Sequence, residues 1–175
     1  PTARARFARE REALAAIRSV HVPRLLGAGE APDDLPHLVL ERLRGPTLFQ
    51  RLRAGEALAL DAALRLGRQL AAALAAVHAA GFVHRDLKPA NLLLHDAEGG
   101  GAPRLLLLDF GVCTRSQGAS RITRPGHTVG TPRYMSPEQA RGLALDGRSD
   151  LFAAGSVLYE LIAGAPPFAG RNPEV

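Results

Sequence analysis

The segment that most constrains this chain is a polar octapeptide, HRDLKPAN at residues 84–91, set between apolar stretches. Residues 61–80 before it carry an apolar stripe of helical period. After it, two short apolar runs at 92–94 and 105–108 are typical of strands. The turn-forming residues 96–101 between those runs indicate a turn or a hairpin loop. The sequence therefore predicts an α+β fold with the octapeptide in an ordered connection.

Local patterns divide the rest of the chain into further elements. The predicted helices span residues 2–18, 61–80 and 150–163, and the predicted strands span 24–29, 37–43, 92–94 and 105–108. Asp61 is the expected N-cap of the second helix, and Gly81 is placed to end it. The third helix is apolar nearly all round, so we expect it to be buried. Residues 112–135 hold no periodicity, and a loop of that length is usually functional.

Composition limits the class of protein. The chain has 175 residues, of which 46% are hydrophobic, enough for one domain with a core. The formal net charge is +5, but the basic residues are scattered, so we expect no nucleic-acid partner. Cys113 is the single cysteine, which fits a reducing compartment, and we expect a small buried side chain there. No apolar run in this stretch is long enough to span a membrane, and no signal peptide is visible.

The octapeptide and the Asp109-Phe110-Gly111 tripeptide contain the groups that phosphoryl transfer requires. A carboxylate at Asp86 would accept a hydrogen bond from an attacking hydroxyl and take its proton. Lys88 would supply positive charge at the transferred group. Asn91 and Asp109 offer oxygen ligands, which suit Mg²⁺.

Four motifs occur together: HRDLKPAN, LDFG, GTPRYMSPEQA and SDLFAAGSVLYELIAGAPPF. Their identity and order resemble the Hanks-type (eukaryotic-like) protein kinases, and SPEQA resembles the bacterial branch. The resemblance implies a two-lobed α+β fold that uses ATP and Mg²⁺. Residues 1–42 would be a remnant of the small lobe, comprising its C helix, two strands and the start of the hinge. Residues 43–175 would be a large lobe that is incomplete at its C-terminal end.

The resemblance also implies roles for individual residues. Those expected around the nucleotide are Leu40 as gatekeeper, Glu41 to Leu43 as the hinge, and Leu93 beneath the adenine, together with Lys88, Asn91 and Asp109. Those expected to be structural or regulatory are Glu10, His84, Arg85, Phe110, Gly111, Glu138 and Asp150. His84 would pack in the core, and Arg85 would pair with a phosphate on the activation segment. Asp150 would hold the backbone of the octapeptide, with a plain N-cap of its helix as an equal alternative.

Substrate class follows from the same resemblance. Lys88 after Leu87, with Gly130-Thr131-Pro132, resembles serine/threonine kinases, and Thr131 would contact Asp86 and Lys88. Candidate phosphorylation sites in the loop are Thr123 and Thr128, then Ser120, each of which has an unmodified hydroxyl as its alternative. The implied partners are proteins with Ser or Thr acceptors, and a kinase–kinase dimer for autophosphorylation.

Two expected groups do not occur in this stretch. A kinase needs a strand lysine on the α- and β-phosphates, but the single lysine is Lys88. Glu10 fits the C-helix glutamate that pairs with such a lysine, and Glu12 is the alternative. Glu138 would be buried without its arginine partner, which is costly. We therefore expect residues 1–175 alone to show little or no activity.

Three functions remain open at this point. The first is a fragment of an active serine/threonine protein kinase, which the intact Asp86, Lys88, Asn91 and Asp109 favour. The second is a pseudokinase or scaffold that binds nucleotide or partner proteins without catalysis. The third, a small-molecule kinase, is disfavoured by the Gly-Thr-Pro and Ser-Pro-Glu segment. We expect a cytoplasmic kinase domain, whatever anchor the full-length protein carries elsewhere.

Overall fold

The computed structural model describes residues 3–31, 35–55, 58–96, 101–115 and 132–168. The helices are α1 (Ala3–Ala16), α2 (Leu48–Arg53), α3 (Leu60–Ala79), α4 (Pro137–Ala140) and α5 (Gly147–Ala163), with 3-10 turns η1 (Pro89–Asn91) and η2 (Pro132–Tyr134). The strands are β1 (Leu25–Glu30), β2 (Pro36–Leu40), β3 (Phe82–Val83), β4 (Leu92–His95), β5 (Arg104–Leu107) and β6 (Thr114–Arg115).

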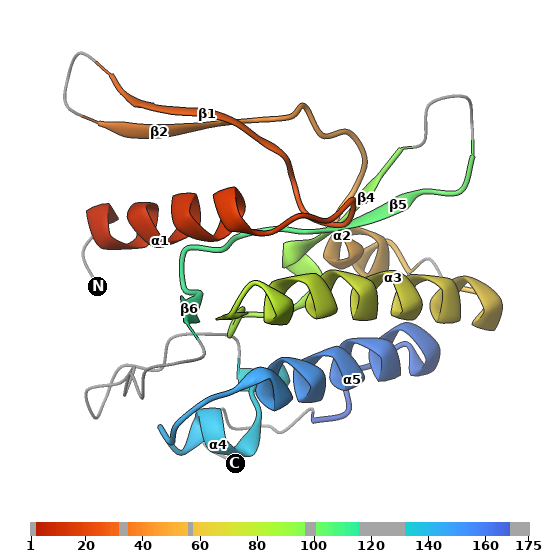
Figure 1. The fold of residues 1–175 in the computed structure, drawn as a ribbon. Coiled ribbons are helices and arrows are strands. Elements are labelled where there is room, and N and C mark those ends of the chain that lie inside the picture. Colours follow the sequence, from red (N-terminus) through yellow and green to blue (C-terminus); the bar gives the residue numbers. More distant parts are fainter. Residues whose placement is uncertain (1–2, 32–34, 56–57, 97–100, 116–131, 169–175) are drawn as a thin grey trace.

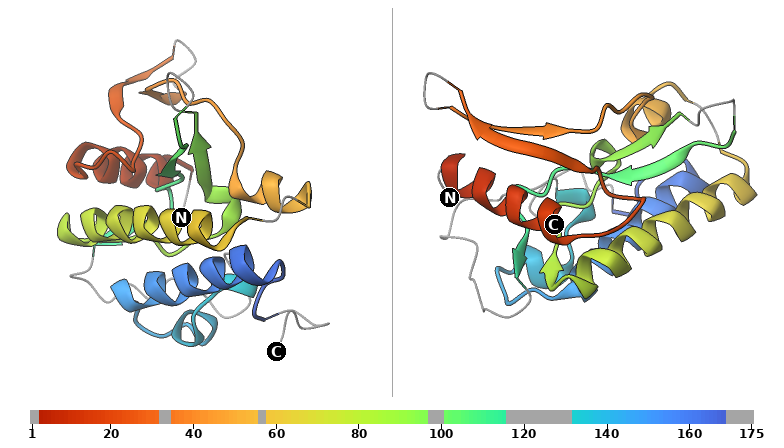
Figure 2. Two further views of the ribbon diagram at one scale, coloured as in Figure 1. Left: turned by 90° about the vertical axis from the view of Figure 1, so that its right-hand side faces the viewer. Right: turned by 45° about the horizontal axis from the view of Figure 1, so that its top comes forward.

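The elements form two groups that meet along the middle of the molecule (Figure 1). The β1–β2 ribbon lies over α1, and the α3 and α5 helices lie side by side below the β4–β5 hairpin, as the turned views also show (Figure 2). His21, after α1, joins the groups: its Nδ1 lies 2.9 Å from the Leu105 carbonyl oxygen, and its own carbonyl accepts from the Leu107 N–H at 2.9 Å. The proposed lobe boundary at residue 42 stays a prediction.

Each described strand pairs with one antiparallel partner: β1 with β2, β3 with β6, and β4 with β5. The β4–β5 hairpin carries the buried side chains Leu92, Leu94, Leu105, Leu106 and Leu107, whereas no residue of β1 or β2 is fully buried. The hairpin is therefore part of the core, and the ribbon is a surface element. The second predicted strand ends at Leu40 rather than at residue 43.

Helix α3 confirms the predicted stripe, since Leu66, Leu70, Leu74 and Val77 are buried. It packs against α5 where Gly67 leaves room: an added Cβ there would lie 3.2 Å from the Leu158 side chain. The prediction that Asp61 caps the helix is wrong. Ala59 is the N-cap, and Asp61 lies in the first turn, where its carboxylate accepts from Arg65 at 2.5 Å.

Helix α5 differs from its prediction in its first residue and in the exposure of its side chains. It begins at Gly147, with the Asp146 carboxylate accepting from the Arg148 N–H, so Asp150 is not the N-cap. Leu151, Tyr159 and Ile162 are about half exposed, so the expectation of burial all round is wrong. Within the described residues, α5 packs against α3, η2 and β3, and these three side chains are left facing solvent.

The predicted loop 112–135 contains two ordered pieces, β6 and η2; residues 116–131 lie outside the described part. A second feature that periodicity did not indicate is α2, which begins at a Thr47–Gln50 capping box. Gly45 precedes it with φ +116°, and a Cβ there would lie 2.0 Å from the Leu94 carbonyl oxygen, so only glycine fits. Across the described part of the chain, no helix is both long and apolar enough to cross a membrane.

Candidate active site

The Asp86 side chain is the centre of a small polar cluster on the 84–91 loop, which joins β3 to β4. Its Oδ2 accepts from Lys88 Nζ at 2.6 Å and from Asn91 Nδ2 at 3.1 Å. Asn91 Nδ2 also donates to the Asp86 carbonyl at 2.8 Å. The Asp86 side chain is 14% exposed and that of Lys88 23%, so the pair lies at the edge of the core within reach of a substrate.

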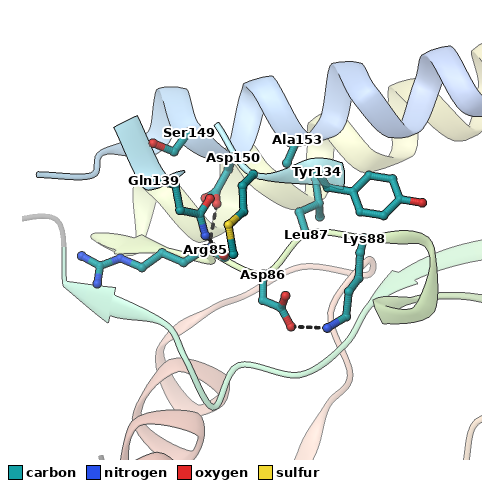
Figure 3. A pocket seen from close by; sticks show the side chains of 10 residues that line it. Arg85, Asp86, Leu87, Lys88, Tyr134, Gln139, Ser149, Asp150 and Ala153 are labelled. Atoms are coloured by element: carbon teal, nitrogen blue, oxygen red, sulfur yellow. Dashed lines mark hydrogen bonds and ion pairs between the residues drawn. The ribbon is translucent and has the colours of Figure 1, made fainter. Parts of the chain in front are cut away.

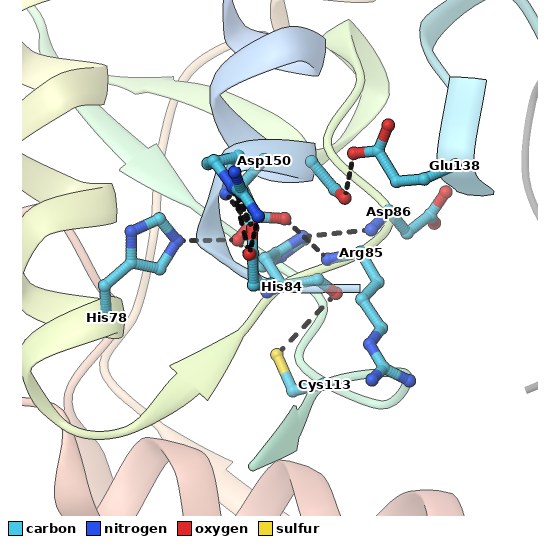
Figure 4. Close-up of polar contacts among 10 residues, drawn as sticks. His78, His84, Arg85, Asp86, Cys113, Glu138 and Asp150 are labelled. Carbon is cyan, nitrogen blue, oxygen red and sulfur yellow. Dashed lines mark hydrogen bonds and ion pairs between the residues drawn. The ribbon is translucent and has the colours of Figure 1, made fainter. Parts of the chain in front are cut away.

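The backbone of the 84–91 loop is held by Asp150 of α5 (Figure 4). The two carboxylate oxygens of Asp150 accept from the His84 N–H at 2.9 Å and from the Arg85 N–H at 2.8 Å. His78 of α3 adds a third contact, with Nε2 2.8 Å from Asp150 Oδ2. Asp150 is 1% exposed, so it is a buried acceptor for the loop rather than the helix cap that the sequence left as an alternative.

Arg85 occupies an uncommon conformation, with φ 70° in the left-handed region. Its carbonyl accepts from Gln139 Nε2 of α4 at 2.6 Å. Its guanidinium Nε and Nη1 are buried and have no hydrogen-bond partner among the described residues. Burial also lowers the pKa of this guanidinium. A buried cation with free donors is a suitable partner for an anion.

His84 and Leu108 connect the 84–91 loop to the end of β5. His84 is fully buried, confirming its predicted place in the core, and its ring meets Phe110 edge to face. Its Nε2 lies 3.0 Å from the Leu108 carbonyl, while its Nδ1 accepts from the Asp86 N–H at 3.4 Å. The Leu108 N–H donates to the Asn91 carbonyl at 2.8 Å. Both sides of Leu108 are thus bound to the loop, which fixes where Asp109 begins relative to Asp86.

Asp109 is exposed and also left-handed, with φ 63°. Its Oδ1 accepts from the Gly111 N–H at 3.2 Å, closing a short turn, and Phe110 is buried beneath it at 1% exposure. Cys113 is fully buried two residues later, as predicted, and its Sγ lies 3.8 Å from the His84 carbonyl. Burial raises the pKa of its thiol well above the ordinary value, which disfavours the reactive thiolate.

The two candidate glutamates of α1 have different neighbours. A Cβ added at Gly111 would lie 4.0 Å from Glu10 Oε2, which places the Glu10 carboxylate beside the Asp109 turn. Burial, and then repulsion by Asp109, raise the pKa of Glu10, and a hydrogen bond from the Phe110 backbone lowers it. Glu12 instead pairs with Arg115 at 2.5 Å in an exposed position. Glu10 is therefore the glutamate that faces the site.

The segment expected to bind adenine lies between the two groups of elements. Leu40 is half-buried against the core. The Glu41 N–H donates to the Arg24 carbonyl at 3.0 Å, and its carboxylate accepts from the Arg24 N–H at 3.0 Å. Leu43 and Leu93 are partly buried, and a bridge pairs Leu93 with Thr47. The roles assigned to these residues stay predictions.

Glu138 corrects one expectation. It is partly exposed rather than buried, and its carboxylate accepts from the Ser149 hydroxyl at 2.5 Å. That hydrogen bond lowers the pKa of Glu138. No unpaired buried charge arises here, because the carboxylate is partly exposed and accepts from the hydroxyl of α5. Thr131, Ser120, Thr123 and Thr128 lie outside the described residues.

A pocket opens between the 84–91 loop and the α4–α5 region (Figure 3). It is lined by residues 85–88 of the loop and by side chains of η2, α4 and α5. The Lys88–Asp86 pair lies at one side, and Gln139 at another. Sequence reasoning missed His78, Gln139 and Ser149 as contributors. Of these, Gln139 and Ser149 lie in quoted motifs, but the motifs alone do not say which atoms they would contact.

Comparison with known families decides the class. A model described as the protein kinase domain matches residues 2–175. The chain belongs to the protein kinase domain family. Within this family it is similar to the serine/threonine-protein kinase PkaA of Streptomyces coelicolor, at 43% identity over 167 residues, 95% of this chain and 30% of that protein. It is also similar to the DNA damage-responsive serine/threonine-protein kinase RqkA of Deinococcus radiodurans, at 42% identity over 176 residues, 97% of this chain and 25% of that protein.

A third relative is the serine/threonine-protein kinase pkn2 of Myxococcus xanthus, at 40% identity over 170 residues, 96% of this chain and 20% of that protein. This kinase-family chain spans about a quarter of the length of the curated relatives it matches. These relatives bear kinase names, and their names give no support to the pseudokinase alternative.

Proposed function

We propose that the full-length protein transfers the γ-phosphoryl group of ATP to serine or threonine hydroxyls of proteins. The observation that carries this proposal is the Asp86 carboxylate, partly exposed and fixed by Lys88 at 2.6 Å and Asn91 at 3.1 Å. Asp86 orients the attacking hydroxyl through a hydrogen bond and accepts its proton as the new bond to phosphorus forms. Lys88 places its positive charge beside the same carboxylate, where the transferred group carries negative charge.

The residues present fit Mg²⁺. The Asn91 amide makes its two hydrogen bonds to Asp86 through Nδ2, which leaves Oδ1 as an oxygen ligand, and Asp109 uses only Oδ1 for Gly111. Among the described residues, no three His, Cys, Asp or Glu side chains gather into a metal cluster. Mg²⁺ suits such a sparse set, because it takes few protein ligands and completes its shell with phosphates and water. When bound, it would neutralise phosphate charge, held by Asn91 and Asp109.

Arg85 supports a proposal about regulation. Its unpartnered buried guanidinium atoms suit a phosphate on the segment that contains Ser120, Thr123 and Thr128. Glu10, beside Asp109, is proposed as the partner of the strand lysine that a kinase places on the α- and β-phosphates, a residue that does not occur in this stretch. Autophosphorylation between two copies of the protein is proposed as the source of that phosphate.

The test is phosphate transfer by the full-length protein from radiolabelled ATP to peptide libraries with Ser, Thr or Tyr as the single acceptor. Ser and Thr peptides should be labelled and Tyr peptides should not. Asp86→Asn should reduce kcat by about 10³-fold or more, since it removes the proton acceptor, and Asp109→Asn should abolish transfer in Mg²⁺. Glu30→Gln, on the exposed end of β1, is the matched control. Retained transfer by either site variant would show that the assigned roles are wrong.

A further inference from the structure

The peptide unit between Arg85 and Asp86 has one short hydrogen bond and one long one. Its N–H, which belongs to Asp86, donates to His84 Nδ1 at 3.4 Å, near the limit for a hydrogen bond. Its carbonyl, which belongs to Arg85, accepts from Gln139 Nε2 at 2.6 Å. The orientation of the peptide that leads directly into Asp86 therefore depends chiefly on Gln139.

This peptide needs an external restraint. Arg85 has φ 70°, a left-handed conformation that is unfavourable for a residue with a Cβ. Asp150 satisfies the Arg85 N–H on one side, but it does not contact the carbonyl on the other. Without the Gln139 bond, the peptide could rotate and carry the Asp86 carboxylate away from Lys88 and Asn91.

Gln139 lies on α4, which is only four residues long but is anchored by two hydrogen bonds. The fully buried Ser136 caps α4, with Oγ accepting from the Gln139 N–H at 3.3 Å. Glu138 joins α4 to α5 through the Ser149 hydroxyl at 2.5 Å. These contacts anchor α4, from which the Gln139 side chain extends to the loop (Figure 3).

We propose that Gln139 is a positioning residue, which holds the Arg85–Asp86 peptide and so aims the Asp86 carboxylate at the acceptor hydroxyl. The inference rests on the proposed transfer function, and it adds a residue outside the 84–91 loop to the machinery. It also couples α4 to the reacting carboxylate, so a displacement of α4 lowers the rate of transfer.

The test compares Gln139→Leu, which cannot hydrogen-bond, with Gln139→Glu, which donates only when protonated. In the full-length protein, Gln139→Leu should lower kcat about 10- to 100-fold, the size expected for a misplaced catalytic group, with KM for ATP within about two-fold. Arg141→Ala, an exposed residue at the end of the same helix, is the control and should leave kcat unchanged.

The dependence of kcat on pH distinguishes a positioning role of Gln139 from a packing role. A carboxyl group at position 139 has an ordinary pKa of about 4.3, raised by its contact with a carbonyl oxygen. As pH falls from 8 to 6, more of the Gln139→Glu side chain is protonated and can donate to Arg85. The kcat of Gln139→Glu relative to Gln139→Leu should therefore rise. A ratio that stays flat, with equal losses of thermal stability in both variants, would reduce Gln139 to a packing role and overturn the inference.

Amide hydrogen exchange tests the contact without using activity. Gln139→Leu should speed exchange of the peptide covering residues 84–88 and leave that of α3 unchanged, whereas unchanged exchange would contradict the inference. If the wild-type protein labels no acceptor, the proposed function fails, and the exchange result still decides whether Gln139 holds the loop. If Gln139→Leu does not fold, the exchange of Gln139→Glu at pH 6 and pH 8 decides in its place.

Discussion

Arg85 and Asp109 share a conformation but are held in opposite ways. They are the two non-glycine residues with positive φ in the described part of the chain, at 70° and 63°. Arg85 is 6% exposed, and its peptide groups bond to Asp150 of α5 and Gln139 of α4. Asp109 is exposed, and its own carboxylate closes the turn by accepting from Gly111.

The difference separates a tertiary restraint from a local one. Aspartate visits the left-handed region readily because its short side chain bonds to its own backbone, whereas arginine has no such compensation. The Arg85 conformation must therefore be stabilised from outside, and its geometry depends on residues more than 50 positions away. The Asp109 turn is closed by its own carboxylate, with Phe110 as its anchor in the core. Distant substitutions should disturb Asp86 and spare Asp109.

Asp150→Ala is the most direct way to break the tertiary restraint. It leaves the buried N–H groups of His84 and Arg85 without an acceptor and should lower the free energy of unfolding of the domain by about 3–5 kcal/mol. Urea denaturation followed by circular dichroism measures the loss. Asp146→Ala, which removes the exposed cap of the same helix, is the matched control, at about 1 kcal/mol. Equal losses would mean that Asp150 acts only as part of its helix.

His78→Leu should weaken the same restraint by less. Asp150 would keep its two backbone donors and lose only the bond from His78 Nε2, at 2.8 Å. The expected loss is about 1.5–3 kcal/mol, the range for a hydrogen bond to a charged group. The measurement is the same denaturation, with exposed His37→Leu as the control for loss of an imidazole. In Asp150→Ala the effect of His78→Leu should vanish, and an unchanged effect there would place the His78 contribution elsewhere.

The contrast also explains what the sequence could predict. The α3 stripe and the buried Cys113 follow from local patterns, and the structure has them. The ends of helices were less certain: Asp61 and Asp150 both suit an N-cap, yet Ala59 and Asp146 occupy those positions. An N-cap side chain accepts from an N–H two or three residues further on. Any of several acidic residues near the start of a helix therefore fits the sequence pattern of an N-cap.

Contacts between distant segments were not predictable from periodicity. His78, Gln139 and Ser149 act through partners 72, 54 and 11 positions away, and no local pattern gives those pairings. The prediction that α5 is buried all round was wrong for the same reason. Hydrophobicity shows that a face can be buried, whereas burial depends on which element packs against it. The expectation that Asp150 holds the octapeptide backbone came only from the resemblance to kinases.

Glu10→Gln tests the charge environment of the Asp109 turn. We expect it to raise the stability of the domain slightly at neutral pH. Burial and the Asp109 charge raise the pKa of Glu10 above its unfolded value. The folded state therefore binds the proton more tightly, and wild-type stability falls as pH rises from the unfolded pKa through the folded one. Gln removes this penalty. The free energy of unfolding should rise by less than about 1 kcal/mol, because the group keeps solvent contact. Melting temperatures at pH 4 and pH 7 test it: the variant should gain at pH 7 and match wild type at pH 4. A gain of equal size at both values would exclude charge as its cause.

Asp109→Asn should have the smallest effect on stability while removing activity. Asparagine is as tolerant of φ 63° as aspartate, and its Oδ1 accepts from the Gly111 N–H in the same way. Loss of the charge also relieves repulsion of Glu10. We expect the free energy of unfolding to change by less than about 0.5 kcal/mol. Asp109→Val is the contrasting variant: a β-branched side chain is a poor fit to the left-handed region, so it should destabilise the turn measurably. If Asn proved as destabilising as Val, the carboxylate charge would be part of what holds the turn, and the Asp109 loop would need an outside restraint as the Arg85 loop does.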